Sequence, residues 1–150
     1  MLPTFLDQPE IDFLILADRA EVLNGKLYLM GGAWDQIGVA DFARPLTFSL
    51  AVGLVIPWNA TNVDHTLELS LLDEDGNALF QWSGGFKTGR PTELPQGASQ
   101  HSILAFTVSV VLPHAGTYRA EAHLNHTSDR ATAFVAHSIA ASVPTQTRRG

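Results

Sequence analysis

Hydrophobic and polar residues alternate with a period of two along most of the chain, and no stretch keeps the period of a helix. Alternation of this kind predicts β-strands with one face toward a core. We expect a hairpin within residues 11–37 and strands near 46–56, 64–72, 78–86, 103–112, 118–124 and 131–139. The pattern predicts an all-β protein: one antiparallel β-sandwich domain over residues 1–150, an immunoglobulin-like Greek key of about eight strands.

The strongest local signal is Asn24-Gly25, which lies between two apolar-rich runs. Both residue types tolerate positive φ, so a two-residue type I′ turn can join two long strands. The turn sets a register that places Leu23 opposite Lys26 and Asp18 opposite Gly31. Side chains alternate across strands, so one face of this hairpin belongs in a core. That face carries Ala20, Val22, Leu27 and Leu29.

Asp18 falls on the same face, opposite a glycine that leaves it room. It could be a carboxylate in a cleft. We favour a structural role in which Asp18 accepts backbone N–H groups near the end of a sheet, because buried polar groups are usually satisfied structurally.

Two other stretches refine the fold. The run from Leu46 to Ile56 is apolar on both faces in its second half, which indicates a central strand or a covered outer face. Gly116-Thr117-Tyr118, at the start of a late strand, resembles a tyrosine corner, in which the phenol bonds back to the backbone. Residues 87–100 form the longest irregular segment, a length typical of a functional or mobile loop.

Charge and cysteine content narrow the classes of partner. Only 16% of residues are charged, the formal net charge is −6, and the nine basic residues are scattered, which argues against nucleic-acid binding. No cysteine is present, so disulfides and thiol chemistry are excluded. No apolar run is long enough to span a bilayer, and no secretory-signal pattern opens the chain, so we expect a cytoplasmic protein without a membrane partner. Residues 1–9 read as an extended lead-in and 143–150 as a disordered tail.

Catalytic and metal motifs are missing from the sequence. The six histidines lack metal-ligand spacing, and the Asp73 to Asn77 stretch is better explained as a turn than as a calcium loop. No nucleophile elbow or phosphate-binding loop occurs. We therefore expect no cofactor, no metal and no enzymatic activity.

The tryptophans offer a different kind of site. Trp34 follows a pair of glycines and Trp58 lies in a loop, so both could stack on a ligand or anchor an interface. The alternative is that they plug the open ends of the sandwich, which we favour because large aromatic residues are mostly buried. A ligand site at one end would use the following residues: Trp34, Asp35, Trp58, Asn59 and Asn62.

As an ordered set, several motifs resemble a family of small, uncharacterised bacterial proteins. They are Ala17-Asp18-Arg19-Ala20, Asn24-Gly25-Lys26-Leu27-Tyr28, Gly31-Gly32-x-Trp34-Asp35, Pro57-Trp58-Asn59-Ala60-Thr61, Asp73-x-Asp75-Gly76 and Pro113-x-x-Gly116-x-Tyr118. The resemblance covers most of the chain. It implies one bacterial β-sandwich domain and transfers no activity, ligand or site residue.

The function we expect is therefore a protein-interaction or assembly module that binds a protein partner or forms a homo-oligomer through a weakly charged sheet face or edge. The alternative is a small-ligand or carbohydrate-binding sandwich that uses loops at one end. In the first hypothesis, Asn24, Gly25, Asp18, Gly116 and Tyr118 have structural roles.

Overall fold

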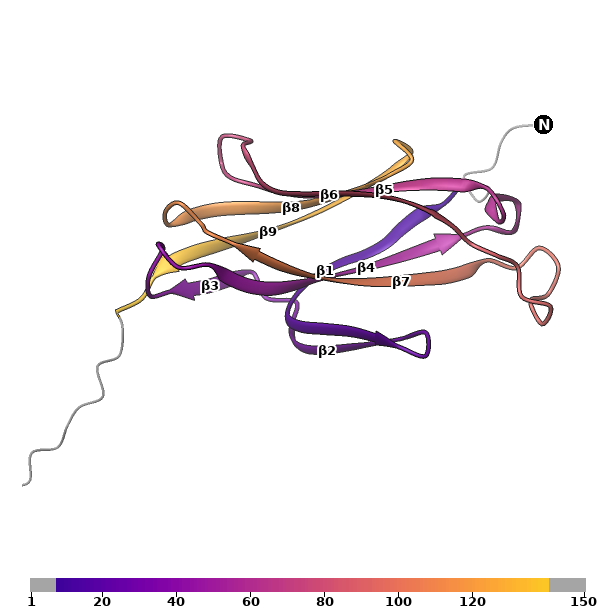
Figure 1. Cartoon of the computed structure of the whole chain (residues 1–150), viewed down its shortest axis with the longest axis horizontal. Helices are drawn as coiled ribbons and strands as arrows, with labels where there is room; N and C mark the ends of the chain where they lie inside the picture. The colour runs from indigo at the N-terminus through magenta and orange to yellow at the C-terminus, as the bar shows by residue number, and fades with distance from the viewer. Residues whose placement is uncertain (1–7, 141–150) are drawn as a thin grey trace, which may run out of the picture.

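The computed structural model describes residues 8–140. These residues form nine β-strands and one short 3-10 helix in two stacked sheets (Figure 1). The strands are β1 (Glu10–Leu23), β2 (Lys26–Gly32), β3 (Gln36–Val39), β4 (Leu46–Ile56), β5 (Asp64–Leu72), β6 (Ala78–Lys87), β7 (Gln100–Val110), β8 (Gly116–Leu124) and β9 (Ser128–Ser138). The 3-10 helix is η2 (Trp58–Ala60).

The all-β, two-sheet architecture confirms the fold class in its coarse form. One sheet has the order β2-β1-β4-β7 and the other β3-β9-β8-β5-β6. Two details differ from the prediction. The described residues form nine strands where about eight were expected, because Gln36–Val39 forms a short strand of its own. The sandwich is also not wholly antiparallel, since β3 pairs in parallel with β9.

The first hairpin has the predicted register. Leu23 pairs with Lys26 and Arg19 with Met30, around a turn in which Asn24 and Gly25 have φ of 51° and 73°. β1 pairs with β4 only as far as Ala17, and beyond that residue its partner is β2. In Figure 1 this part of β1 bends away and runs beneath the sandwich together with β2. We call residues 18–32 the arm.

The arm corrects one prediction about the core. The face that carries Ala20, Val22, Leu27 and Leu29 is not part of the core: the first three are half-buried and Leu29 is exposed. The alternation was read correctly, because these residues are mostly less exposed than those on the opposite face. Their burial was overestimated because strand alternation cannot show that a hairpin leaves the sandwich.

β4 is an inner strand of its sheet and is buried along most of its length. Its inward residues, among them Leu50 and Val52, are fully buried. Its outward residues Ser49 and Ala51 are also buried, and Gly53 faces the ring of Phe13 so closely that a Cβ there would overlap the ring. Both explanations given for the apolar second half of this strand are confirmed. The outer face of β4 is consequently covered by the chain itself from Ser49 to Gly53.

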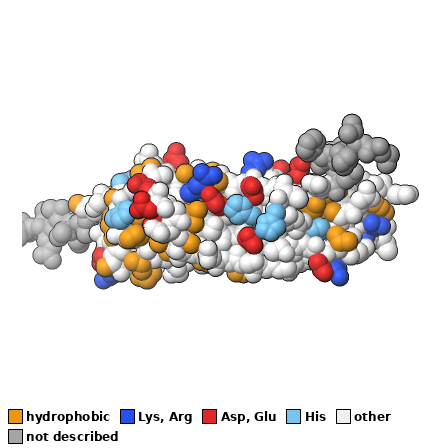
Figure 2. Space-filling view, turned by 90° about the horizontal axis from the view of Figure 1, so that it is seen from above, with side chains coloured by type: hydrophobic (Ala, Val, Ile, Leu, Met, Phe, Trp, Pro, Cys, Tyr) orange, Lys and Arg blue, Asp and Glu red, His pale blue; other side chains and the backbone are white. Residues whose placement is uncertain are grey.

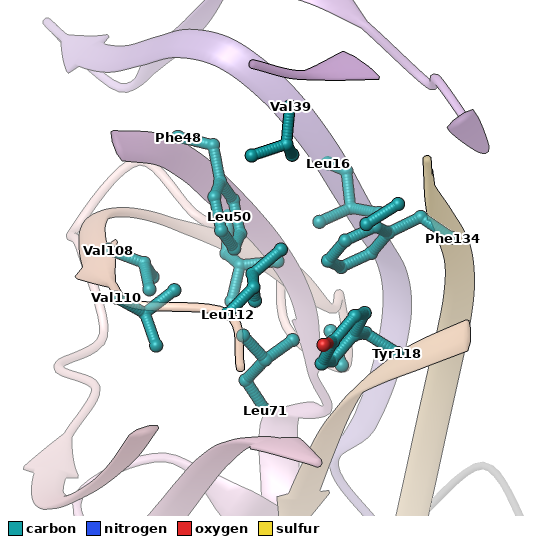
Figure 3. Close-up of a cluster of buried hydrophobic side chains, with 12 residues drawn as sticks. Leu16, Val39, Phe48, Leu50, Leu71, Val108, Val110, Leu112, Tyr118 and Phe134 are labelled. Carbon is teal, nitrogen blue, oxygen red and sulfur yellow. The ribbon is translucent and has the colours of Figure 1, made fainter. Parts of the chain in front are cut away.

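The core between the sheets has two parts. One surrounds aromatic side chains, with Tyr118 stacked on Phe134 at 5.6 Å between ring centroids (Figure 3). Phe48 meets Phe134 edge-on at 5.9 Å. The second part is aliphatic and lies toward the other end of β4, around Leu54 and Leu67. Burial of these side chains is the main favourable term that holds the sheets together.

The predicted tyrosine interaction is present. The Tyr118 hydroxyl donates to the backbone oxygen of His114 at 2.5 Å and accepts weakly from the His114 N–H at 3.4 Å. Burial raises the pKa of the Tyr118 phenol, so the hydroxyl stays protonated and able to donate. At Gly116, a Cβ would lie 2.9 Å from Glu74 Oε1, which accepts the Thr117 N–H at 2.7 Å.

The chain ends fall mainly outside the described residues. Of the predicted lead-in, residues 1–9, only Gln8 and Pro9 are described, and Pro9 is buried. The predicted tail, residues 143–150, lies outside the described residues altogether.

Candidate interaction surface

The arm gathers exposed apolar side chains. Among the described residues, eight large hydrophobic side chains are exposed, and four of them lie on the arm. Met30 is 67% exposed, Leu23 55% and Tyr28 53%, and these three share one face of the hairpin because they belong to the same set of cross-strand pairs. Single exposed apolar residues need no explanation, but a cluster on a projecting element indicates a binding surface.

Charged residues border this face. Glu21 pairs with Tyr28, Arg19 pairs with Met30, and Lys26 lies beside the turn. An apolar centre with a polar rim is the usual arrangement of a protein-binding surface, and tyrosine, methionine and arginine are enriched in such surfaces.

The base of the arm is shaped by Asp18 and Gly31. Gly31 has a φ of 60°, and the carboxylate of Asp18 occupies the space that a Cβ at position 31 would fill. Asp18 is exposed, and within residues 8–140 no hydrogen bond to its carboxylate is found. The expected backbone N–H donors are therefore not among the described residues, although the predicted opposition of Asp18 and Gly31 is confirmed.

A groove separates the arm from the sandwich. Its volume is about 470 Å³, and it is lined by residues 20–23 of β1 and 103–106 of β7. The groove lies where β1 has left β4, so the edge of β1 that faces it is not paired with β4. The arm is thus attached to the body mainly through its base and is exposed over most of β2.

The residues predicted for a ligand site lie at two opposite ends of the sandwich. Trp34 packs edge-on against Phe48 and Phe134, at 5.8 and 5.4 Å, close to the start of β4. Trp58 follows the far end of the same strand. The eleven residues of β4 place the two ends roughly 30 Å apart. Trp34 and Trp58 are therefore not brought together, and one small ligand cannot bridge them.

Trp34 packs against the aromatic part of the core. Its ring closes the aromatic part of the core, and its buried Nε1 has no hydrogen-bond partner among the described residues. Asp35, beside it, is exposed, and its backbone oxygen accepts the N–H of Val135 at 2.9 Å. Both residues therefore help to hold β3 against β9.

At the other end, Trp58 and Arg90 form a small polar and aromatic cluster. The Arg90 guanidinium carbon lies 3.8 Å from the Trp58 ring centroid, and its nitrogens bond Trp58 O and Thr61 Oγ1, each at 2.9 Å. Asn59 and Asn62 are exposed nearby in the chain, and Asn62 N–H donates to Thr88 O at 2.8 Å. Trp58, Asn59 and Asn62 thus remain one loop cluster, with Arg90 of the 87–100 segment over the tryptophan.

Trp82 is part of the packing between the sheets. Its ring lies 4.7 Å from that of Phe106, and Gly84 leaves the space that the indole needs. This contact joins β6 to β7 at the side where both strands are sheet edges.

An ionic network on the outer face of the five-stranded sheet was missed in the sequence. His123 Nδ1 lies 2.6 Å from Asp129, its Nε2 lies 3.2 Å from Glu121, and Arg119 lies 3.0 Å from the same Glu121. The hydrogen bond to Asp129 raises the pKa of His123. Figure 2 shows histidine, acidic and basic side chains close together on this face. Cross-strand register places His123 opposite Asp129 in the structure. The sequence pattern did not reveal this pair because the predicted final strand began only at residue 131.

The network borders a trough whose lining includes His123. The trough has a volume of about 440 Å³ and is lined in part by Glu68, Ser70, Gln81 and Ser83. In the described part of the chain, no hydrogen bond joins a serine to His123, and no group of three or more His, Asp or Glu side chains is placed to hold a metal ion. His123 instead lies between two carboxylates, which favour its protonated form.

The side chain of His65 is buried and forms two hydrogen bonds within the chain. Its Nε2 donates to Ala60 O at 2.7 Å, and its Nδ1 accepts from Asn125 Nδ2 at 2.8 Å. Asn125 Oδ1 in turn accepts the Thr66 N–H at 2.8 Å. His65 is therefore a packed histidine that links the η2 segment to the turn after β8.

The Asp73 turn also has a structural explanation. The Asp73 carboxylate accepts the backbone N–H groups of Asp75 and Asn77, at 2.9 and 2.8 Å, and these bonds lower the pKa of Asp73. The acidic turn thus stabilises itself through its own backbone.

Within residues 8–140, no helix has the length and apolar character needed to cross a membrane.

Comparison with known proteins places the chain in a family. A search of curated proteins finds no match. Among solved structures, the chain is similar to a candidate beta-galactosidase from Bacteroides fragilis, with 19% identity and a TM-score of 0.42 over 60% of this chain and 14% of that one. The model of a family of unknown function, DUF6941, matches residues 12–136. Because this match covers most of the sequence, the chain belongs to the DUF6941 family.

Proposed function

We propose that this protein is a non-enzymatic interaction or assembly module whose binding element is the arm. The observation that carries the proposal is the grouping of Leu23, Tyr28 and Met30 on one exposed face of a projecting hairpin. Covering such a face removes apolar area from water, at a gain of about 25 cal/mol per Å² before the costs of association.

The sequence alone suggested a different location for the surface. The sequence suggested a weakly charged sheet face or edge, and the outer face of β4 does not supply one at Ser49 and Ala51, which are buried within the chain. The low overall charge and the unpaired edge of β2 still favour association by a sheet edge. The proposal therefore keeps the class of function and moves the surface to the arm.

Sedimentation of a matched set of variants tests this proposal. The double variant Tyr28→Ser/Met30→Ser removes apolar surface from the arm, and Val63→Ser/Val111→Ser removes exposed apolar surface elsewhere. We expect the wild type and the valine variant to associate with themselves or with a protein partner, and the arm variant to lose that association. Equal association of all three proteins would contradict the proposal.

A second candidate function is ligand binding by the Trp58 loop. The stacking of Arg90 on Trp58 favours it, because this guanidinium brings hydrogen-bond donors to a half-buried aromatic residue. Asn59 and Asn62 belong to this candidate site, whereas Trp34 and Asp35 lie at the other end. Trp58→Ala should abolish binding of small carbohydrates and leave the fold intact; loss of stability without any binding by the wild type would reject this function.

The immunoglobulin-like topology, the cellular location and the classes of partner are also proposals. The Tyr118 to His114 hydrogen bond supports an immunoglobulin-like Greek key, whereas the parallel β3 is an addition to that plan. A cytoplasmic location and the absence of nucleic-acid and membrane partners stay predictions from the sequence.

A further inference from the structure

The outer edge of β2 has unpaired backbone groups. In a two-residue type I′ hairpin, the residues that flank the turn exchange backbone hydrogen bonds, and every second pair along the ladder does the same. Leu23 with Lys26 is the flanking pair, so Tyr28 and Met30 also bond inward to β1. The N–H and C=O groups of Leu27 and Leu29 therefore point to the outer edge, where the sheet ends; Gly31, with its left-handed backbone, departs from this regular alternation.

This edge lacks the usual protection against pairing. Edge strands are commonly shielded by short length, charge or proline. β2 has seven residues, six of them exposed, and residues 27–34 contain no charged residue and no proline. In Figure 1, β2 is the strand of the arm that lies farther from the sandwich, so its edge faces outward. By contrast, the edge strand β3 has only four residues.

We propose, resting on the function proposed above, that a second copy of this chain pairs along β2 in antiparallel orientation, with Leu29 opposite Leu29 of the second copy. Leu29 is the midpoint of Lys26–Gly32, so only this register pairs all seven residues of β2. The result is one sheet that continues through both molecules by way of the two arms.

Side chains agree with this register. Tyr28 falls opposite Met30 of the second copy in a pair without mutual backbone bonds, where side chains are closest. A methionine sulfur beside an aromatic ring is a favourable contact. The pairing occurs twice by symmetry, and it covers the two most prominent apolar side chains of β2.

The charged residues of the arm are compatible with this register. Each of the two rows that contain Tyr28 and Met30 runs from Glu21 through Tyr28 and the second copy's Met30 to its Arg19, so each of these rows has an acid at one end and a base at the other.

The contact is small, so the dimer is expected to be weak. Stable interfaces use about 20–30 residues from each partner, whereas the arm has only residues 18–32. Self-association should accordingly depend on concentration, with dissociation in the micromolar to millimolar range.

Single cysteines test the register, because the chain contains none of its own. Leu29→Cys places two thiols across the symmetry axis, with Cα atoms about 5.5 Å apart, a separation that a disulfide can bridge. Leu27→Cys is the matched control, since its two copies would lie about 13 Å apart along the strands. Under mild oxidation, we expect Leu29→Cys to form dimers at least about tenfold faster than Leu27→Cys.

A mixed experiment reads the side-chain pairing directly. Tyr28→Cys and Met30→Cys are oxidised alone and as a mixture, and the products are identified by mass. The register predicts that the mixed disulfide predominates over either homodimer. Equal rates for Leu29→Cys and Leu27→Cys, or homodimers in preference to the mixed product, would overturn the proposal.

A charge variant distinguishes antiparallel pairing along β2 from the more general proposal that the arm is the binding element. Met30→Glu faces Arg19 within the arm, so the hairpin is retained, but in the dimer it sets a carboxylate against Tyr28 of the second copy. We expect it to weaken dimerisation at least about tenfold relative to the exposed control Val63→Glu. Dimers that form through the arm without the Leu29 crosslink would overturn the register and leave the proposed function standing. Association unaffected by any substitution on the arm would overturn both.

Discussion

The carboxylate of Asp18 fills the space that a side chain at position 31 would require, and Gly31 itself has a left-handed backbone with φ of 60°. The two residues lie where the arm leaves the sandwich. This relationship explains why a glycine is needed at that point, because both the backbone conformation and the neighbouring carboxylate disfavour a Cβ.

Gly31→Ala should therefore loosen the base of the arm. We expect a loss of about 1–2 kcal/mol from the left-handed backbone alone, with a further cost from displacing Asp18. Hydrogen exchange should show faster amide exchange in residues 18–32, while the strands of the core stay protected. Gly89→Ala is the control, since a Cβ there meets no atom within 4 Å. Uniform destabilisation of the whole domain would contradict a local role.

Tyr118→Phe should lower the free energy of unfolding by about 1 kcal/mol, because it removes the hydrogen bond to His114 O while retaining the ring. Urea unfolding measures the change. Tyr28→Phe serves as the control, since that hydroxyl belongs to an exposed residue of the arm. If the two variants had equal stability, the Tyr118 bond would contribute nothing to the fold.

Trp34 is predicted to act as a plug. Trp34→Ala should destabilise the protein by about 3 kcal/mol, the lower end of the range for large aromatic residues, because the ring is only half-buried. Trp34→Phe should cost clearly less, since it keeps contacts with Phe48 and Phe134 and removes an Nε1 that has no described partner. Thermal unfolding compares the two, and an equal loss for both variants would show that the ring contacts are not the stabilising feature.

His123 should make stability depend on pH. Its pKa is raised in the folded protein, chiefly by the hydrogen bond to Asp129. The stabilisation is therefore fully present below the unfolded-state pKa and is lost as pH rises through the folded-state value. The effect should be small because Asp129 is largely exposed. Titration of the imidazole by NMR should show a pKa above the ordinary value, which Asp129→Asn should lower; no change in that variant would contradict the assignment.

The sequence was informative where one local rule decides the structure. Asn24 and Gly25 set the hairpin register, and alternation located β5 with the bounds found. The sequence did not indicate how the strands, once formed, are arranged relative to one another. Nothing local states that β1 leaves β4 after Ala17, because strand pairing is a long-range property.

The same contrast between local patterns and long-range arrangement holds for the candidate interaction surface. The residues of the arm were predicted as a hairpin and not as a binding surface, and Leu29 was assigned to the core, because alternation distinguishes two faces without saying what covers either one. The His123 network depended on extending the last strand back to Ser128, and boundaries of elements are harder to predict than their existence. Trp34, which follows a pair of glycines, and Trp58, which lies in a loop, were grouped in one ligand site, although β4 separates them.

The central claim is that the arm is the surface through which this protein associates. A dilution series followed by backbone NMR tests it most directly, between about 1 mM and about 10 μM, the range expected for a weak interface. We predict concentration-dependent shifts and broadening confined to residues 18–32 and the adjoining groove residues of β7. Spectra that do not change with dilution, or changes centred on another face of the sandwich, would contradict the claim.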